Sequence, residues 1–393
     1  MDGVYNERLL APETTDQFLW ILIVASFGAF FAAFGIGAND VANAFATSVG
    51  AKALTLRQAV CLAAVFEFLG AVLLGSHVTK TIRSGIADAN FSSLQIGCFA
   101  DNPGILMYGN MCVVYTTGTW LLLACYLELP VSTTHSTVGG VIGMAMAYGG
   151  ADCILWNEET DTFPYLDGVA AIVASWFLSP VLSALIAVFL FFTVRMFVLR
   201  SEHSLARSMY AFPVLVTAAI AVNVFFIVYK GASGLDLDET SLEDAFAWAF
   251  GLGVGIGVLM ICTVLPYMKK QIDIKFNNDG TLKQVAEEAP KDENAPQHGG
   301  LVGYLQRQLD QDMHAHVKDS EYISAIHENA EKFDPRTEEA FKYVQIFTAI
   351  CDSFSHGAND VANAMGPFSG IYLVYTEGGS LRRMTSGTAC SGS

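Results

Sequence analysis

The sequence predicts an all-α protein that crosses a membrane several times, and three observations support this fold class. Hydrophobic residues make up 53% of the chain and charged residues only 15%, with a mean hydropathy of +0.42. Apolar stretches of about 17 to 25 residues, the length of a bilayer-spanning helix, recur along the first two-thirds. The octapeptide Gly-Ala-Asn-Asp-Val-Ala-Asn-Ala occurs twice, at 37–44 and 357–364. A composition this apolar excludes an ordinary soluble domain.

The apolar stretches predict a first membrane region, residues 1–266, with about seven transmembrane segments, and an eighth segment that opens near residue 343. The fourth stretch is short and carries five glycines, which is typical of a broken or half-membrane helix. The alternate glycines at 251–257 lie inside an apolar stretch, so they predict close helix packing rather than a nucleotide-binding loop. The seven stretches occupy 18–36, 58–75, 105–127, 134–150, 168–194, 211–229 and 246–266.

The two remaining regions differ in composition. Residues 267–342 are charged and have no long apolar run, which predicts a cytoplasmic loop, partly disordered around 283–294, with an amphipathic helix over 304–330. Residues 343–393 hold the second motif copy and a polar tail. We expect this last region to be the start of a second repeat that the chain leaves incomplete, as a truncated sequence would.

The positions of basic residues predict the orientation in the membrane. Lys and Arg concentrate on the cytoplasmic side of membrane proteins, and here they flank the stretches at 50–57, 195–210 and 267–270. This pattern predicts an extracellular N-terminus and a cytoplasmic large loop, although Lys80 and Arg83 fall on the opposite side.

The predicted outer loops carry two candidate modification sites. Asn90-Phe91-Ser92 matches the acceptor pattern for N-glycosylation, which predicts a glycan on Asn90. Cys98 and Cys153 fall in two different outer loops, where they could form a disulfide or remain free thiols. The sequence leaves this choice open.

Polar residues within the apolar stretches mark candidate functional positions, because an unpaired polar group is costly at membrane depth. Glu67 lies in the middle of the second stretch with apolar residues on both sides. It must face a cavity or a partner, be protonated, or hold a structural position through backbone amides.

A run rich in hydroxyl groups precedes the short fourth stretch. Pro130 introduces it, and five of the six residues 132–137 carry a hydroxyl, including Ser132, Thr133 and Thr134. The free N–H groups of a helix start bind anions. Ordinary helix capping is the alternative, but a cap needs only one hydroxyl. The run therefore favours an anion site.

The repeated motif groups oxygen ligands that suit a small cation. If the segment is helical, Asn39, Asp40 and Asn43 share one face. Carboxylate and amide oxygens are ligands for hard cations. A cation would also offset the repulsion between the aspartates and an anion held at the hydroxyl-rich run. The two features together predict cation-coupled anion transport, with Na⁺ or H⁺ as the coupled ion.

The duplicated octapeptide, a glutamate 27 residues after Asp40, and the run Pro-Val-Ser-Thr-Thr-His at 130–135 together resemble the inorganic phosphate transporter family. The resemblance covers nearly the whole chain apart from the charged loop. It implies an inverted-repeat transporter bundle with broken helices, in which phosphate and Na⁺ bind where the repeats meet. The implied activity is import of inorganic phosphate by symport with a cation, Na⁺ being favoured.

The resemblance also implies roles for single residues. Asp40 and Asp360 would bind Na⁺, and His356 would open the second signature where the first has Ile36. Phosphate binding would fall to polar residues of the two motifs, the second stretch and the hydroxyl-rich run: Asn39, Asn43, Glu67, Ser132, Thr133, Thr134, Asn359 and Asn363.

Other functions for this site remain open. A phosphate-binding sensor without transport, or a symporter of another tetrahedral oxyanion such as sulfate, would use the same residues. An intramembrane aspartyl protease needs two aspartates, but Ala38 and Asn39 separate Gly37 from Asp40, so no enzymatic activity is predicted. We expect a lipid bilayer, most simply the plasma membrane, no nucleic acid, no cofactor, no metal beyond Na⁺, and a homodimer as one way to complete the site.

Overall fold

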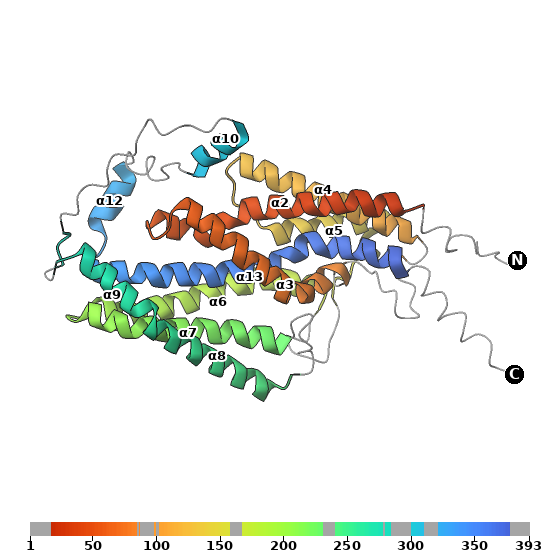
Figure 1. The fold of residues 1–393 in the computed structure, drawn as a ribbon. Coiled ribbons are helices and arrows are strands. Elements are labelled where there is room, and N and C mark those ends of the chain that lie inside the picture. Colours follow the sequence, from red (N-terminus) through yellow and green to blue (C-terminus); the bar gives the residue numbers. More distant parts are fainter. Residues whose placement is uncertain are drawn as a thin grey trace, which may run out of the picture. The chain divides into compact units, whose positions relative to one another are not determined.

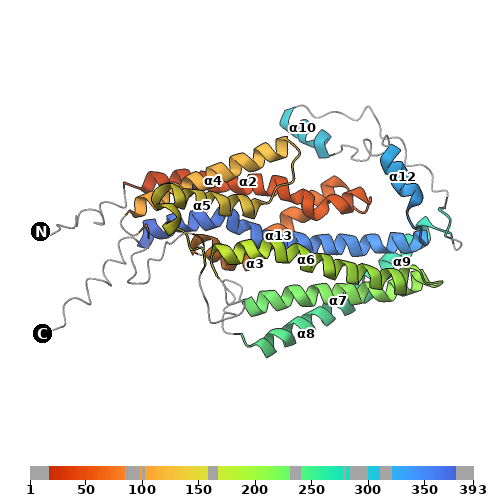
Figure 2. The same cartoon turned by 180° about the vertical axis from the view of Figure 1, so that it is seen from behind.

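The computed structural model describes residues 17–84, 86, 98–99, 102–157, 167–230, 240–277, 280–283, 300–309 and 321–377. Almost all of these residues are helical (Figures 1 and 2), and Phe276 and Leu282 form an isolated antiparallel bridge. The predicted all-α fold class is confirmed. The chain divides into two compact units.

The prediction of a multi-pass membrane protein is also confirmed. Helices α4 (Pro103–Tyr126) and α5 (Thr133–Gly149) match the third and fourth predicted segments. Helix α5 has 17 residues, the short length that its glycines predicted. Within the described residues, five helical stretches are long and apolar enough to cross a bilayer: Leu19–Gly50, Leu56–Ser76, Val169–Leu199, Ser204–Tyr229 and Leu242–Lys275.

Both motif copies lie inside long helices. Helix α2 (Leu19–Gly50) continues 14 residues beyond the stretch predicted to end at residue 36, and α13 (Pro335–Glu377) contains the second copy. Alanine, the strongest helix former, recurs through the motif, so nothing there interrupts the backbone hydrogen bonds. Pro367, three residues after the second copy, lies within α13 without ending it.

Helix α5 begins and ends at residues that suit these positions. The Ser132 Oγ accepts a hydrogen bond from the His135 N–H at 3.2 Å, which caps the first turn. At the other end Gly150 adopts a φ of 79°, a left-handed conformation that glycine takes without strain. These two signals fix the length of the helix.

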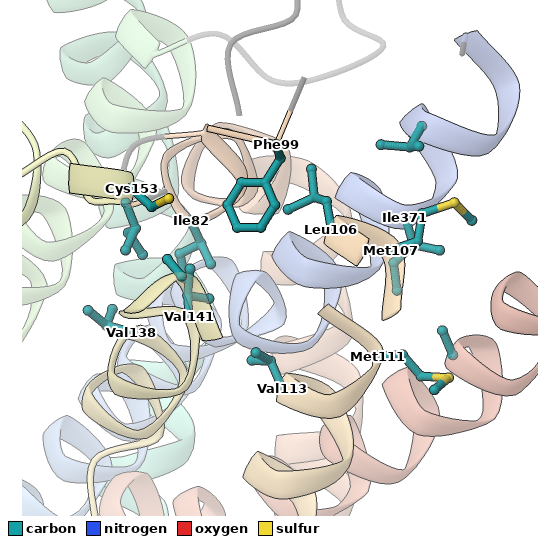
Figure 3. Packing of buried hydrophobic residues seen from close by; sticks show 14 of the residues in the cluster. Ile82, Phe99, Leu106, Met107, Met111, Val113, Val138, Val141, Cys153 and Ile371 are labelled. Atoms are coloured by element: carbon teal, nitrogen blue, oxygen red, sulfur yellow. The ribbon is translucent and has the colours of Figure 1, made fainter. Parts of the chain in front are cut away.

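The first unit comprises Met1–Ala42, Gly70–Val181 and Gly357–Ser393. In both views α4 and α5 lie beside α2 (Figures 1 and 2). Its core brings together apolar side chains from α2, the end of α3 (Leu56–Ser84), α4, α5 and the C-terminal part of α13. Figure 3 shows part of this cluster; its largest fully buried members are Phe99, Ile86, Met107, Ile371 and Val138.

Helices α2 and α4 approach closely because glycines lie at their crossing. A Cβ on Gly35 would come within 3.2 Å of the Gly118 carbonyl oxygen. A Cβ on Gly118 would come within 3.1 Å of the Ala32 Cα. In a membrane, where lipid is as apolar as a side chain, close packing of this kind holds helices together.

A disulfide joins Cys98 to Cys153 in the first unit, with the two Cα atoms 5.3 Å apart. This observation decides the pairing that the sequence left open. The bond ties the segment before α4 to the 3₁₀ turn η2 (Gly150–Cys153) that follows α5. Asn90, the predicted glycosylation site, lies outside the described residues.

The second unit comprises Asn43–Leu69 and Leu182–His356. Helices α7 (Ser204–Lys230) and α8 (Leu242–Cys262) lie side by side in both views (Figures 1 and 2). A Cβ on Gly253 of α8 would come within 3.0 Å of the Ala221 Cβ of α7, and one on Gly257 would collide with the Thr217 Oγ1. The predicted role in close packing is thus confirmed for Gly253 and Gly257, whereas a Cβ on Gly251 or Gly255 would meet no atom within 4 Å.

Part of the region predicted as a loop, 267–342, is helical. Helix α9 (Val264–Lys275) packs Met268 and Ile272 against Ala340 at the start of α13. Helices α10 (Gly300–Leu309) and α12 (Glu321–Asn329) cover parts of the amphipathic helix predicted over 304–330, while 310–320 lie outside the described residues.

Glu331 anchors the segment after α12 to the π-helical turn η3 (Arg195–Leu199). Its carboxylate accepts hydrogen bonds from the Arg195 Nε at 2.8 Å and from the Arg200 Nε at 2.7 Å. The hydrogen bond from Arg200, and next that from Arg195, hold the pKa of Glu331 below its usual value of 4.5.

Loss of the disulfide should lower the thermal stability of the protein. In the chain-entropy account, a cross-link between residues 55 apart restricts the unfolded chain by about 4 kcal/mol at room temperature. The double variant Cys98→Ser/Cys153→Ser should melt at a lower temperature than the wild type in detergent. Cys61→Ser, which changes an exposed free thiol, is the matched control. Equal melting temperatures for all three proteins would contradict this expectation.

The contacts of Glu331 should hold at neutral pH and weaken in acid. A lowered pKa means that the carboxylate stabilises the fold above its usual value of 4.5, and that this stabilisation is lost as the pH falls through the lower folded value. Glu331→Gln should therefore raise amide hydrogen exchange in 321–334 at about pH 7, and approach the wild type once the pH falls below the lowered pKa of Glu331. Glu328→Gln, an exposed carboxylate on α12, controls for loss of charge. A difference that persists unchanged in acid would show that the ion pairs are not its source.

Candidate functional site

The second motif copy lies in a buried part of α13 that belongs to the first unit. Its alanines Ala358, Ala362 and Ala364 are buried, which lets the neighbouring helices come close to the backbone. Asp360 is 9% exposed and Asn363 is 0% exposed. Side chains of these types need hydrogen-bonding partners when they leave water.

The hydroxyl-rich start of α5 supplies those partners. The Thr133 Oγ1 donates to the Asp360 Oδ1 at 3.0 Å. The Asn363 Nδ2 lies 3.0 Å from both the Thr133 Oγ1 and the Asp360 Oδ1, and 3.2 Å from the Thr134 Oγ1. Two threonines and the second motif therefore form one buried network, and this network joins the two features that the sequence singled out.

The side-chain oxygen of Asn363 is an acceptor that the network leaves unused. The Asn363 Oδ1 is buried and accepts no hydrogen bond from any residue that the structure describes. One turn further along α5, the Thr137 Oγ1 lies 3.5 Å from the Asn363 carbonyl oxygen and keeps this part of α13 in place. An amide oxygen left in this state can accept a hydrogen bond from a ligand or contact a cation.

The first motif copy holds the chain just before α5. The Asn39 Nδ2 donates to the Leu129 carbonyl oxygen at 3.2 Å, and the Asn39 Oδ1 accepts from the Val131 N–H at 3.3 Å. Both edges of the amide are thus used on the backbone that leads into Ser132. Asn39 consequently fixes the position of the hydroxyl-rich turn.

The two motif aspartates lie close together in the first unit. Asp40 is 4% exposed, and a carboxylate oxygen of Asp40 lies within 4.8 Å of one of Asp360. Two negative charges at this separation repel by about 3 to 4 kcal/mol at an effective dielectric constant of about 20. A cation or a proton between them would remove that cost, so the pair is suited to bind a small positive ion.

The two identical octapeptides present different residues to their surroundings. Asn39, the third residue of the first copy, is buried, whereas its counterpart Asn359 is exposed. Asn363, the seventh residue of the second copy, is buried, whereas its counterpart Asn43 is exposed. The two identical copies therefore have different surroundings, with a different asparagine buried in each.

The side chain of Ser132 caps the N-terminus of α5, which is the alternative to anion binding considered from the sequence. It is exposed and accepts the His135 N–H at the start of α5. Thr133 and Thr134 point their hydroxyls to Asn363 instead. One hydroxyl of the run thus serves as the cap, and those of Thr133, Thr134 and Thr137 contact the second motif. The Ser136 hydroxyl donates to the Ser132 carbonyl oxygen at 2.8 Å instead.

The remaining predicted residues belong to the second unit. Glu67 is half-buried in α3, and Asn43 is exposed on α2. His356 is half-buried on α13, one helical turn before Asp360. The roles predicted for these three residues, and for the others of the site, stay predictions.

Sequence reasoning missed two contributors to the site. The backbone at Leu129 and Val131 binds Asn39, and no side-chain pattern signals such a contact. Thr137 belongs to the predicted hydroxyl-rich run but was not singled out as a site residue, and it touches the second motif from α5. Its position four residues after Thr133, on the same face of one helix, was a signal that could have revealed it.

Comparison with known proteins gives the site a context. Residues 36–388 match the family described as the phosphate transporter family. The sodium-dependent phosphate transporter 1 of Mus musculus is 36% identical over 263 residues, which cover 67% of this chain and 36% of that protein. The sodium-dependent phosphate transporter 2 of Felis catus is 37% identical over 70% of this chain and 39% of its own length.

Two other matches extend further along the chain. The phosphate-repressible phosphate permease pho-4 of Neurospora crassa is 27% identical over 92% of this chain and 77% of its own length. A solved structure titled the sodium-dependent phosphate transporter is similar with a TM-score of 0.63 and 31% identity, covering 90% of this chain and 68% of the other. The chain thus spans less than half the length of the mouse and cat transporters.

Replacing Thr133 by valine should destabilise the first unit. The substitution keeps the side-chain shape but removes the hydroxyl that contacts both Asp360 and Asn363. Leaving those buried groups with fewer partners should cost about 1 to 3 kcal/mol. A lower apparent melting temperature in detergent would show this.

The matched control is Thr119→Val. The Thr119 hydroxyl lies on an exposed face of α4 and bonds only the Tyr115 carbonyl oxygen, at 2.7 Å. It should leave the melting temperature nearly unchanged. If both variants melted alike, the buried network would not contribute to stability.

Proposed function

Since the chain belongs to the phosphate transporter family, we propose that it imports inorganic phosphate across a membrane together with Na⁺. The observation that carries this proposal is the pair of buried carboxylates, Asp40 and Asp360, next to the hydroxyls and amides at the start of α5. The carboxylates suit the cation, and the hydroxyl and amide donors suit the oxygens of a phosphate. The names of the mouse and cat relatives specify sodium dependence, which agrees with this choice of ions.

The coupling follows from electrostatics. Two aspartates alone would repel a phosphate anion, so the site holds phosphate well only when cations have neutralised the aspartates. Binding of Na⁺ at Asp40 and Asp360 therefore has to accompany binding of phosphate. Each positive charge that moves down a membrane potential releases about 2.3 kcal/mol per 100 mV. Two or more Na⁺ ions could thus concentrate an anion.

Phosphate would be held by donors from α5 and from the motifs. Thr133 and Thr134 lie at the first turn of α5, where backbone N–H groups and the helix dipole favour an anion. Asn363 already contacts both hydroxyls, so a phosphate oxygen could take the place of a threonine at its amide group. We keep the sequence-based proposal that Ser132, Asn39 and Asn359 contribute to phosphate binding. Asn43, Glu67 and His356 belong to the second unit, and the roles predicted for them from the sequence stay predictions.

The orientation that we propose is an extracellular N-terminus with the large loop in the cytoplasm of a cell whose plasma membrane holds the protein. Disulfides persist on the oxidising side of a membrane, and Cys98–Cys153 lies on the side predicted to be extracellular. A homodimer remains our proposal for the assembled state. Phosphate sensing without transport and transport of sulfate have no observation in their favour.

Uptake of ³²P-phosphate tests the proposal directly. The chain would be expressed in cells that lack their own phosphate transporters, and uptake would be compared in sodium and in choline medium. Sodium-dependent uptake that excess sulfate does not suppress is the expected result. Phosphate binding without uptake, by protein shown to be at the membrane, would favour a sensor and overturn the transport proposal.

Asp360→Asn should reduce sodium-dependent uptake to near the background of untransfected cells. The neutral amide removes the charge that attracts Na⁺ but keeps the size of the side chain, and Asp40→Asn should act alike. Asp273→Asn, a change of the same kind at an exposed position on α9, is the control for expression and charge. Uptake by Asp360→Asn at the wild-type rate, with equal surface expression, would remove this aspartate from the transport site.

A further inference from the structure

The second unit contains a cavity of about 410 Å³ whose lining includes several polar side chains. Residues from three helices line it: Asn43 and Thr47 from α2, Asn223 from α7, and Thr348, Asp352 and Ser355 from α13. Most of its lining side chains can form hydrogen bonds. A cavity of this composition holds water or a polar ligand rather than lipid.

The positions of the lining residues place this cavity among membrane helices. Asn43 and Thr47 lie one turn apart on the candidate span Leu19–Gly50, and Asn223 lies on the candidate span Ser204–Tyr229. On α13, Thr348, Asp352 and Ser355 follow each other at intervals of four and three residues, so they share one face. Polar faces inside a membrane domain mark the path of a substrate or an ion.

A hydrogen bond holds one wall of the cavity in a defined geometry. The Ser355 hydroxyl can donate to the Asn223 Oδ1 at 3.3 Å or to the Cys351 carbonyl oxygen at 3.0 Å, while the Asn223 Nδ2 donates to the Ala219 carbonyl oxygen at 2.9 Å. The amide of Asn223 is thereby oriented with its oxygen toward Ser355 on α13. Oxygen atoms from two helices consequently converge on this wall.

The charge of the lining determines which ligand fits. Asp352 is the one charged residue among the residues that line the cavity, and neither Lys nor Arg is among them. A single carboxylate surrounded by amide and hydroxyl oxygens repels an anion and attracts a cation. One negative charge matches one positive charge, which favours a monovalent ion over a divalent one.

The volume indicates how such an ion would bind. A water molecule occupies about 30 Å³ of liquid, so the cavity is about an order of magnitude larger than one water. An ion in this space would keep part of its hydration shell and reach Asp352 directly or through a water molecule. Binding of this kind is weak and depends strongly on the carboxylate charge.

We propose that this cavity is a binding site for a hydrated monovalent cation, Na⁺ in particular, with Asp352 as its charged ligand. The site is additional to the pair Asp40 and Asp360. Its use as a loading site for the co-transported ion rests on the proposed function, but its affinity for Na⁺ can be measured without transport.

The test is equilibrium binding of ²²Na⁺ to the purified full-length chain in detergent, with choline replacing sodium to keep the ionic strength constant. Asp352→Asn should raise the Na⁺ concentration for half-saturation at one site at least tenfold, or remove one bound Na⁺ per chain. Asp352→Glu should restore binding in part, because it returns the charge at nearly the same place. Asp273→Asn, which removes an exposed carboxylate outside the cavity, should bind as the wild type does.

Thr348→Val provides a second variant that keeps the charge. It should weaken Na⁺ binding by a smaller factor than Asp352→Asn, because it removes one neutral oxygen. Size-exclusion profiles and melting curves of each variant exclude misfolding as the cause. If Asp352→Asn and Thr348→Val both gave the wild-type isotherm, the cavity would not be a cation site.

Uptake of ³²P-phosphate by the same variants separates this proposal from the proposed function. If the wild type takes up no phosphate but Na⁺ binding still depends on Asp352, transport is refuted and the cavity site stands. If sodium-dependent uptake is present and Na⁺ binding is independent of Asp352, the cavity proposal is overturned and transport stands. If both hold, Asp352→Asn should need at least tenfold more Na⁺ for half-maximal uptake.

Discussion

The close approach of two buried carboxylates, Asp40 and Asp360, is the constraint on which the first unit depends. Carboxylates within 4.8 Å of each other are unfavourable unless hydrogen bonds, a proton or a cation compensate. The chain meets this constraint with the first turn of α5, where Thr133 and Asn363 both contact the Asp360 Oδ1. The capped start of α5, the alanines of α13 and the glycine contacts between α2 and α4 all serve to bring these groups together.

The duplicated motif shows how one sequence can play two structural parts. In the first copy the third residue, Asn39, forms hydrogen bonds with the backbone of the segment before α5. In the second copy the seventh residue, Asn363, forms hydrogen bonds with two threonines of α5. The aspartate at the fourth position is buried in both copies. The carboxylate is thus the element that the two copies have in common, while each amide supports it from its own surroundings.

In the second unit, polar side chains line a cavity. Its cavity contains one carboxylate, Asp352, among neutral oxygen donors, and the contact of Ser355 with Asn223 holds its wall. A weak, hydrated cation site and a site with two buried carboxylates would differ in affinity, because the second removes more water from the ion and provides more charge. A protein that moves ions benefits from this difference, since a site of low affinity fills and empties quickly.

The sequence by itself determined the fold class, the short fourth segment, the packing role of Gly253 and Gly257 in α8 and the residue types of the site. These follow from local properties: apolar length sets a membrane helix, glycine spacing sets close contact, and buried Asp or Asn in an apolar run demands a partner. Predictions from local sequence also failed at some element ends. The apolar stretch predicted to end at residue 36 says nothing of the alanine-rich motif that extends α2 to Gly50.

Only the tertiary structure decided which residues meet. These contacts join positions that are from 55 to 230 residues apart. They are the disulfide between Cys98 and Cys153, the hydrogen bonds of Asn363 to Thr133 and Thr134, and the hydrogen bonds of Asn39 to the backbone of Leu129 and Val131. Such contacts depend on how helices cross, which no local pattern encodes. Two identical octapeptides received different neighbours for the same reason: the sequence fixes what a residue can bind, and the packing of the helices fixes what it does bind.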